Sequence, residues 1–251
     1  MNHYLLADAH LFPEPESHPG RDRLIAFLEV LIKERPGTLW ILGDLFDFWF
    51  EYGSVAPAGH WRVLSALRAL SDQGWELKVL PGNHDGWLGE HFMAASGASV
   101  LSQQVVRTEI AGREAALAHG DGLGSGDLGY RLLLRPLLRS SLAAHLFRLV
   151  HPDLGRLFAR AFSGTSRRIL RRRAETMPEG VAEWASSMLE SVDLVVTAHT
   201  HLPLVRQLPE GIHLSLGDWI RSFSHARVDQ SGVELFVDGE RVDDAGWPSR
   251  A

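Results

Sequence analysis

Side chains that can bind divalent metal ions occur in five short clusters along the sequence. Carboxylate and amide oxygens and imidazole nitrogens suit hard or borderline cations such as Mn²⁺, Zn²⁺ and Fe²⁺. The sequence contains no cysteine, which excludes thiolate ligands, thiol nucleophiles and disulfides. Any metal must therefore be held by nitrogen and oxygen ligands. The clusters are Asp8-Ala9-His10, Gly43-Asp44, Gly82-Asn83-His84-Asp85, His119-Gly120-Asp121 and Ala198-His199-Thr200-His201.

Each cluster follows a short apolar stretch that predicts a β-strand. The first predicted strand, Tyr4–Ala7, ends just before Asp8, and the second, Thr38–Leu42, ends just before Gly43. In open α/β sheets, ligand sites form outside the carboxyl ends of the strands. We therefore expect clusters that are far apart in the sequence to converge on one rim. The other strands that precede a cluster are expected at Leu77–Leu80, Glu114–Ala118 and Asp193–Thr197.

The remaining pattern predicts an α/β protein in which residues 1–251 form one domain. Amphipathic helices are expected at Arg21–Glu34 and at Trp61–Leu70. Residues 123–180 are rich in Leu, Arg and Ser at helical spacing, which predicts a helical insertion within the domain. We expect a loose tail at Asp243–Ala251. Further strands are expected at Val105–Ile110, Leu204–Leu208, Ile212–Leu216 and Val233–Val237.

Composition and charge argue against several classes of protein. The formal net charge of −6 makes a general affinity for nucleic acid backbones unfavourable, so we expect no nucleic acid partner. The sequence has no uncharged apolar run of about 18 residues, the length that a membrane-spanning helix needs. Residues 1–7 do not resemble an export signal. We therefore expect a cytoplasmic location.

Chance and structural roles are the alternatives to a metal centre. A lone histidine such as His60 or His225 is more often structural than a ligand. Isolated Gly-Asp or Asp-x-His patterns are also weak evidence in a chain with 13 His and 24 Gly. Five such clusters in order, each after a predicted strand, are much harder to attribute to chance. The set as a whole predicts a metal centre.

The five clusters together resemble the signature of the calcineurin-like metallophosphoesterases. The resemblance implies a four-layer α/β/β/α sandwich and a centre of two divalent ions, with Mn²⁺ expected and Zn²⁺ or Fe²⁺ as alternatives. The last cluster usually begins with Gly in that family, where this chain has Ala198. The resemblance implies that Asp44 bridges two ions, one held by Asp8, His10 and His201 and the other by Asn83, His119 and His199.

A narrower resemblance comes from the residues around the clusters. Leu42–Trp49 and the segment from His119 to Tyr130 are similar to the bacterial UDP-2,3-diacylglucosamine diphosphatases of lipid A synthesis. This resemblance implies that the insertion 123–180 forms a lid over acyl chains and that Asp127 and Tyr130 touch the substrate. It implies hydrolysis of a pyrophosphate to UMP and 2,3-diacylglucosamine 1-phosphate. Many close members carry Arg where this chain has His84, so a relative with another substrate is an alternative.

Two residues of the third cluster are candidates for catalysis beyond metal binding. His84 can donate a proton to the leaving oxygen or stabilise charge on the phosphoryl group. We expect the adjacent Asp85 to orient the imidazole ring of His84, since second carboxylates fix histidine tautomers. Activated water then serves as the nucleophile, so no protein nucleophile is required.

The insertion also carries a dense group of arginines that includes Arg167 and Arg168. This group can be a solvated face, can bind the substrate's phosphates, or can meet anionic lipid headgroups. The expected partners are a UDP-linked diacylglucosamine lipid and the inner leaflet of the cytoplasmic membrane, contacted peripherally. Two rivals stay open: a phosphoesterase for another phosphodiester, a soluble nucleotide or a phosphoprotein, and a non-catalytic scaffold of the same fold.

Overall fold

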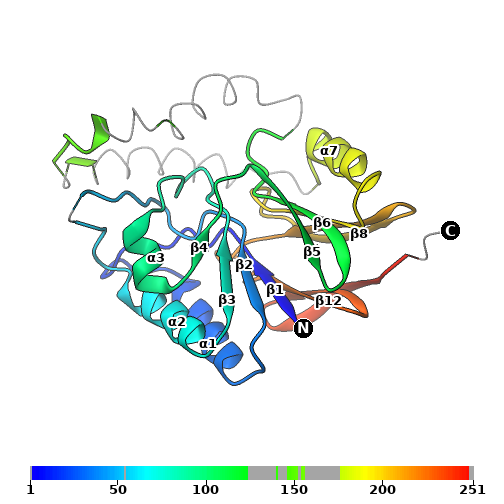
Figure 1. Cartoon of the computed structure of the whole chain (residues 1–251), viewed down its shortest axis with the longest axis horizontal. Helices are drawn as coiled ribbons and strands as arrows, with labels where there is room; N and C mark the ends of the chain where they lie inside the picture. Colours follow the sequence, from blue (N-terminus) through cyan, green and yellow to red (C-terminus); the bar gives the residue numbers. More distant parts are fainter. Residues whose placement is uncertain are drawn as a thin grey trace.

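The computed structural model of the chain describes residues 2–53, 55–123, 140, 146–151, 154–155 and 176–248. It shows a mixed α/β protein with two β-sheets and helices packed against them (Figure 1). Most of the predicted insertion 123–180 lies outside the described residues. The four residues expected to contact the substrate also lie outside the described residues: Asp127, Tyr130, Arg167 and Arg168.

The first sheet has seven strands in the order β12-β11-β10-β1-β2-β3-β4. Strands β1 to β4 are parallel to one another, and β10 pairs with β1 in the antiparallel sense. Helices α1 (Arg21–Ile32), α2 (Trp61–Asp72) and α3 (Glu90–Ser96) alternate with the parallel strands in the chain. The strands are β1 (His3–Leu6), β2 (Thr38–Ile41), β3 (Glu76–Val79), β4 (Ser99–Val100), β10 (His225–Asp229), β11 (Gly232–Val237) and β12 (Glu240–Gly246).

The second sheet has five strands in the order β5-β6-β7-β9-β8. Strands β6, β7 and β9 run parallel, while β5 and β8 are antiparallel to their neighbours at the two edges. Helix α7 (Glu179–Leu189) lies against this sheet (Figure 1). The strands are β5 (Val105–Ile110), β6 (Arg113–Ala118), β7 (Leu194–Thr197), β8 (Pro203–Leu208) and β9 (Gly211–Leu216).

Three apolar cores follow from the alternation of side chains along the strands. Tyr4 and Leu6 of β1 point to the core shared with helices α1 and α2, while Leu5 points to the core between the two sheets. In the second sheet, Leu194 and Val196 of β7 face that same central core, whereas Val195 faces α7. Because β1 is covered on both faces, its residues Tyr4–Leu6 form a continuous apolar run.

The predicted strands, and the helices predicted at Arg21–Glu34 and Trp61–Leu70, are confirmed to within a few residues, but one prediction at the C-terminus is wrong. Residues 243–246 are not a loose tail, because they belong to β12, which pairs with β11. The sequence does not indicate this strand because ERVDDAG is polar and lacks a strand pattern. The strand forms at the sheet edge through its pairing with β11. The sequence analysis also missed α3, α7, β4 and β10.

His213 of β9 is expected to make the stability of the fold sensitive to acid. Its side chain is 2% exposed, and its Nε2 atom lies 2.9 Å from the hydroxyl oxygen of Thr197. Burial, and then nearby Arg206, lower the pKa of His213 to about 4. The unfolded chain therefore takes up this proton near its ordinary pKa of 6.5, while the folded chain does not do so until near 4. Stability is lost as the pH falls through that window.

The matched variant is His213→Gln, which stays neutral. Between pH 7 and pH 5, we expect the wild-type free energy of unfolding to fall by about 1–2 kcal/mol more than that of the variant. Urea titrations at the two pH values measure both. Equal losses in the two proteins would show that His213 does not cause the acid sensitivity.

Candidate metal centre

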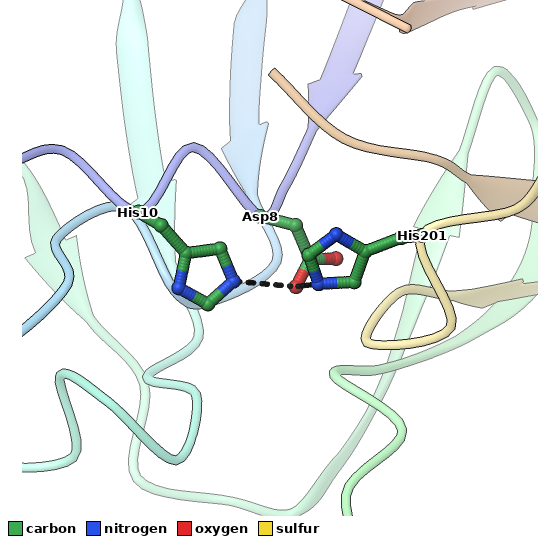
Figure 2. Close-up of side chains that lie close together, drawn as sticks. All are labelled: Asp8, His10 and His201. Atoms are coloured by element: carbon green, nitrogen blue, oxygen red, sulfur yellow. Dashed lines mark ion pairs between the residues drawn. The ribbon is translucent and has the colours of Figure 1, made fainter. Parts of the chain in front are cut away.

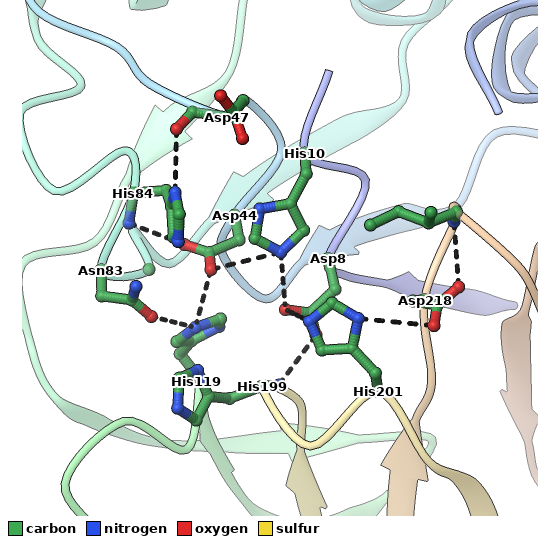
Figure 3. A network of polar contacts seen from close by, with 12 residues as sticks. Asp8, His10, Asp44, Asp47, Asn83, His84, His119, His199, His201 and Asp218 are labelled. Atoms are coloured by element: carbon green, nitrogen blue, oxygen red, sulfur yellow. Dashed lines mark hydrogen bonds and ion pairs between the residues drawn. The ribbon is translucent and has the colours of Figure 1, made fainter. Parts of the chain in front are cut away.

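The seven predicted metal ligands come together at one end of the two sheets (Figure 3). Those of the first sheet follow the carboxyl ends of β1, β2 and β3, and those of the second follow β6 and β7. Hydrogen bonds between loops hold this arrangement: the amide of Asp8 donates to the Gly43 carbonyl at 3.0 Å, and the amide of His10 donates to the Asp44 carbonyl at 2.8 Å. The parallel pairing of β1 and β2 thus continues into the ligand loops.

Five of the seven ligand positions have a left-handed backbone conformation. Such a conformation is uncommon for residues other than glycine, and it is often retained at functional sites. It turns the chain sharply after β1, β2 and β7, where these residues lie. These residues are Asp8, His10, Asp44, His199 and His201, with φ of 54°, 45°, 53°, 65° and 57°.

The first ligand group consists of Asp8, His10 and His201 (Figure 2). The Asp8 carboxylate is fully buried, and its Oδ2 accepts a hydrogen bond from the amide of His199 at 2.7 Å. Its Oδ1 faces the Nε2 atoms of His10 at 3.6 Å and of His201 at 3.4 Å. One oxygen is therefore fixed by the backbone, and the other is directed at the two imidazoles.

The second ligand group is built in the same way around Asp44. Asp44 Oδ1 accepts the amide hydrogen of His84 at 2.9 Å, and its Oδ2 lies 3.5 Å from His119 Nε2. Asn83 Oδ1 is 3.3 Å from the same nitrogen of His119, and His199 completes the group. Asp44 Oδ2 is also 3.6 Å from His10 Nε2, so this oxygen lies between the two groups, as a bridging ligand would.

The tautomer of His119 follows from its neighbour. Its Nδ1 lies 2.7 Å from the carbonyl oxygen of Leu42. A carbonyl can only accept, so Nδ1 carries the hydrogen and donates it. Nε2 is the nitrogen that faces Asp44 and Asn83, and it can bind a metal ion when the ion displaces its proton.

The separations between these atoms fit shared metal coordination better than hydrogen bonding. Nitrogen-to-oxygen distances of 3.4–3.6 Å are long for a hydrogen bond. Ligands held about 2.1 Å from one ion lie about 3.0–3.4 Å from each other, close to the spacing here. Asp8 Oδ1 and His10 Nε2 are buried and make no hydrogen bond among the described residues. Because buried polar atoms are normally paired, these two atoms fit a divalent cation.

The electrostatics of the site favour a cation. Burial would lower the pKa of His119, but the Asp44, Asp8 and Asp121 carboxylates raise it to about 10. Burial alone would raise the pKa of Asp8, yet the imidazoles of His201, His10 and His119 lower it to about 2. The pKa of Asp44 lies well below its ordinary value, because neighbouring histidines outweigh its burial. Protons and metal ions therefore compete for this site, and metal affinity falls as the pH falls.

His84 forms a third group of possible ligands with His10 and Asp44, and its ring lies 4.7 Å from that of His10. Its Nδ1 is 2.8 Å from the carbonyl oxygen of Asp47, which can only accept, so Nδ1 donates and Nε2 is the atom that faces the site. The expectation that Asp85 orients this ring is wrong. The Asp85 carboxylate accepts the amide hydrogens of Asp44, Leu45, Phe46 and Gly82 instead.

Two buried carboxylates lock the second and third ligand loops to each other. Asp85, in the third loop, accepts hydrogen bonds from backbone amides of the second loop. Burial and then the charge of Asp44 raise the pKa of Asp85 to about 6. Glu51, in the second loop, accepts the amides of Gly89, His91 and Phe92 at the start of α3. The two loops therefore hold one another, and Asn83 and Asp44 stay in register.

Glycine is required where these loops touch. Gly43 has φ +86°, and a Cβ there would lie 2.6 Å from His119 Nδ1. A Cβ at Gly82 would overlap Asp44 Oδ1. A larger residue at either position would displace a ligand.

Sequence reasoning missed one polar residue of the site, Asp218 of the loop after β9. Its carboxylate is buried and lies 3.4 Å from His201 Nδ1 (Figure 3). The signal was present, since Gly217-Asp218 follows a strand just as Gly43-Asp44 does.

The fold and the site define a metal-dependent phosphoesterase of the metallophosphoesterase class. The chain is 34% identical to the UDP-2,3-diacylglucosamine hydrolase of Porphyromonas gingivalis, with 92% of this chain and 95% of the relative covered. It is 33% identical to the enzyme of that name from Pseudomonas syringae, with 92% and 93% covered. The chain belongs to the UDP-2,3-diacylglucosamine hydrolase family.

Among solved structures, a double mutant of Vps29 from Entamoeba histolytica matches with a TM-score of 0.50 and 16% identity, over 98% of this chain and all of that one. At this identity the likeness concerns the fold alone. No family model matches the sequence. Within the described part of the chain, no helix combines the length and the apolar character that crossing a membrane requires.

Metal binding should be visible as thermal stabilisation. At a free Mn²⁺ concentration about 1,000-fold above the Kd, the chelator-treated protein is expected to gain about 4 kcal/mol, since the ion binds only the folded state. For a chain of this size the gain raises the melting temperature by about 8–16 °C. Differential scanning fluorimetry measures the rise.

His119→Ala removes a ligand and is expected to reduce the rise by half or more. His91→Ala is the control, because His91 is a histidine outside the ligand groups. Equal rises in the wild type and His119→Ala would exclude His119 as a ligand.

Proposed function

We propose that this chain hydrolyses the pyrophosphate of UDP-2,3-diacylglucosamine to UMP and 2,3-diacylglucosamine 1-phosphate. The substrate comes from the names of relatives that match along more than nine-tenths of this chain. The observation that carries the chemistry is the position of Asp44 Oδ2 between His10 Nε2 and His119 Nε2. This arrangement supports two adjacent cation sites that share one carboxylate.

The proposed centre holds two ions, most favourably Mn²⁺. Asp8, His10 and His201 would hold one, Asn83, His119 and His199 the other, and Asp44 both. When bound, such a pair lowers the pKa of water and stabilises charge on the phosphoryl oxygens during an in-line displacement. The mixed set of nitrogen and oxygen ligands suits Mn²⁺ and also accommodates Zn²⁺ or Fe²⁺.

The chain's own residues would position the substrate and handle the proton. His84 Nε2 faces the ligand groups, so a protonated His84 can donate a proton to the leaving oxygen. The Asp47 carbonyl keeps the ring in this orientation whether or not Nε2 is protonated, because it needs only the Nδ1 hydrogen. Burial of the ligand carboxylates excludes water from their other faces.

We further propose the four-layer α/β/β/α arrangement, with residues 123–180 as a lid over the acyl chains. The three apolar cores support the layer order. Asp127, Tyr130, Arg167 and Arg168 would contact the substrate within the lid.

In the described part of residues 146–155, Leu146, Leu149 and Leu154 are 58%, 83% and 52% exposed. These exposed side chains support binding of a lipid substrate and peripheral contact with the inner leaflet of the cytoplasmic membrane from the cytoplasmic side.

A second candidate is a phosphoesterase for a water-soluble phosphodiester or nucleotide. It is favoured by His84, because the resemblance to the diphosphatases implies Arg at this position.

Turnover of UDP-2,3-diacylglucosamine by the purified chain, with Mn²⁺ and mild detergent, should yield UMP and the lipid monophosphate, identified by mass. Asp44→Asn is expected to lower the rate by about 100-fold or more, because it removes the negative charge of the carboxylate that the two proposed cation sites share. Asp193→Asn, a buried carboxylate outside the site, is the control. No cleavage of the lipid, together with cleavage of a soluble phosphodiester, would favour the second candidate.

His84→Gln is expected to lower kcat by about 10²–10⁴-fold, the usual contribution of general acid catalysis. Metal uptake by the variant, measured by calorimetry, should equal that of the wild type, because His84 acts on the proton. An unchanged kcat would exclude the proton-donor role, and a loss of metal uptake would make His84 a ligand instead.

A further inference from the structure

Asp218 uses its two carboxylate oxygens for different purposes. The side chain is 3% exposed. Its Oδ1 accepts three amide hydrogens of the following turn, from Ile220 at 2.9 Å, Arg221 at 2.7 Å and Ser222 at 3.1 Å. Its Oδ2 accepts no amide hydrogen from the described residues and lies 3.4 Å from His201 Nδ1 (Figure 3). The turn therefore fixes which oxygen faces the histidine.

The same turn also touches the other end of the first ligand group. The amide of Trp219 donates to the carbonyl of Asp8 at 3.1 Å. The hydroxyl of Ser224 donates to the carbonyl of Leu216, and the amide of Ser224 donates to the carbonyl of Asp218, which closes the loop on itself. Two successive residues, Asp218 and Trp219, thus contact two ligands of one cation site.

We propose that Asp218 is a positioning residue for the cation site of Asp8, His10 and His201. This inference rests on the metal centre proposed above. The negative Oδ2 of Asp218 lies 3.4 Å from His201 Nδ1, an ion-pair distance, and its charge favours a hydrogen on that nitrogen. The Nε2 atom of His201 is then left to face the site, where it lies 3.4 Å from Asp8 Oδ1. His119 has a neutral carbonyl in the equivalent place. The first site therefore receives an additional negative charge at its imidazole, which makes His201 a stronger ligand.

The decisive variant is Asp218→Asn. Its Oδ1 can still accept the three amide hydrogens, so the turn is preserved, and those donors direct the new NH₂ group at His201. An NH₂ group can only donate, so His201 Nδ1 must become the acceptor and the hydrogen moves to Nε2. A histidine protonated at Nε2 cannot bind a metal ion through that atom. Asp193→Asn is the matched control, as a buried carboxylate that accepts a backbone amide away from the site.

The first measurement is the tautomer of His201 in the chelator-treated full-length chain, by long-range ¹H–¹⁵N correlation. The wild type and Asp193→Asn should show the Nδ1–H form, and Asp218→Asn should show the Nε2–H form. The second measurement is Mn²⁺ binding by calorimetry. Asp218→Asn should weaken one of two binding steps by about 10–100-fold and leave the other at its wild-type affinity.

An unchanged tautomer in Asp218→Asn, or two binding steps of wild-type affinity, would overturn the proposal. The tautomer measurement needs no metal, so it decides the role of Asp218 independently of the metal centre. A wild-type chain that binds no Mn²⁺ but shows the tautomer exchange would overturn the proposed function instead.

Discussion

Two fully buried carboxylates, Asp8 and Asp44, face the same imidazole nitrogen of His10. Buried like charges repel each other, and each loses its hydration, so this pair is strongly unfavourable without compensating positive charge. Backbone amides compensate one oxygen of each carboxylate. Imidazoles, and the cations that we propose, compensate the other. The rest of the site follows from this need to hold two negative charges close together.

The sheets supply the rigidity that such a site needs. Parallel strands end at the same level, so the residues that follow β1, β2 and β3 reach one place without long loops. Left-handed turns at five ligand positions then turn the chain sharply after β1, β2 and β7. These turns are strained, and the buried strands on either side, packed on both faces, offset their cost. The second sheet brings His119 and the two histidines after β7 to the same rim.

Beyond the ligands, three carboxylates fix the loops through backbone amides. Asp85 and Glu51 join the second and third loops in both directions, and Asp218 shapes the turn after β9. In each case a single buried side chain accepts several amide hydrogens that the irregular backbone would otherwise leave unpaired. The sequence places these residues near the ligands, but their effect is on geometry, because none of them belongs to a ligand group.

The sequence by itself determined the types of the ligands, their order and the strands that they follow, because apolar runs ending in Gly, Asp and His are local patterns. It therefore predicted the α/β class and the clusters that come together at one rim, and the family resemblance implied which seven of their residues are ligands. Strand β12 and the helices α3 and α7 escaped it, since their stability comes from neighbours rather than from a strong local pattern. Only the tertiary structure decided what Asp85 and Asp218 do. Asp85 is next to His84 in the sequence, yet it contacts amides that are about 40 residues away, and Asp218 reaches His201 across a strand hairpin. Hydrogen-bond partners depend on distances between chain segments, which the folded structure sets and a linear pattern does not contain.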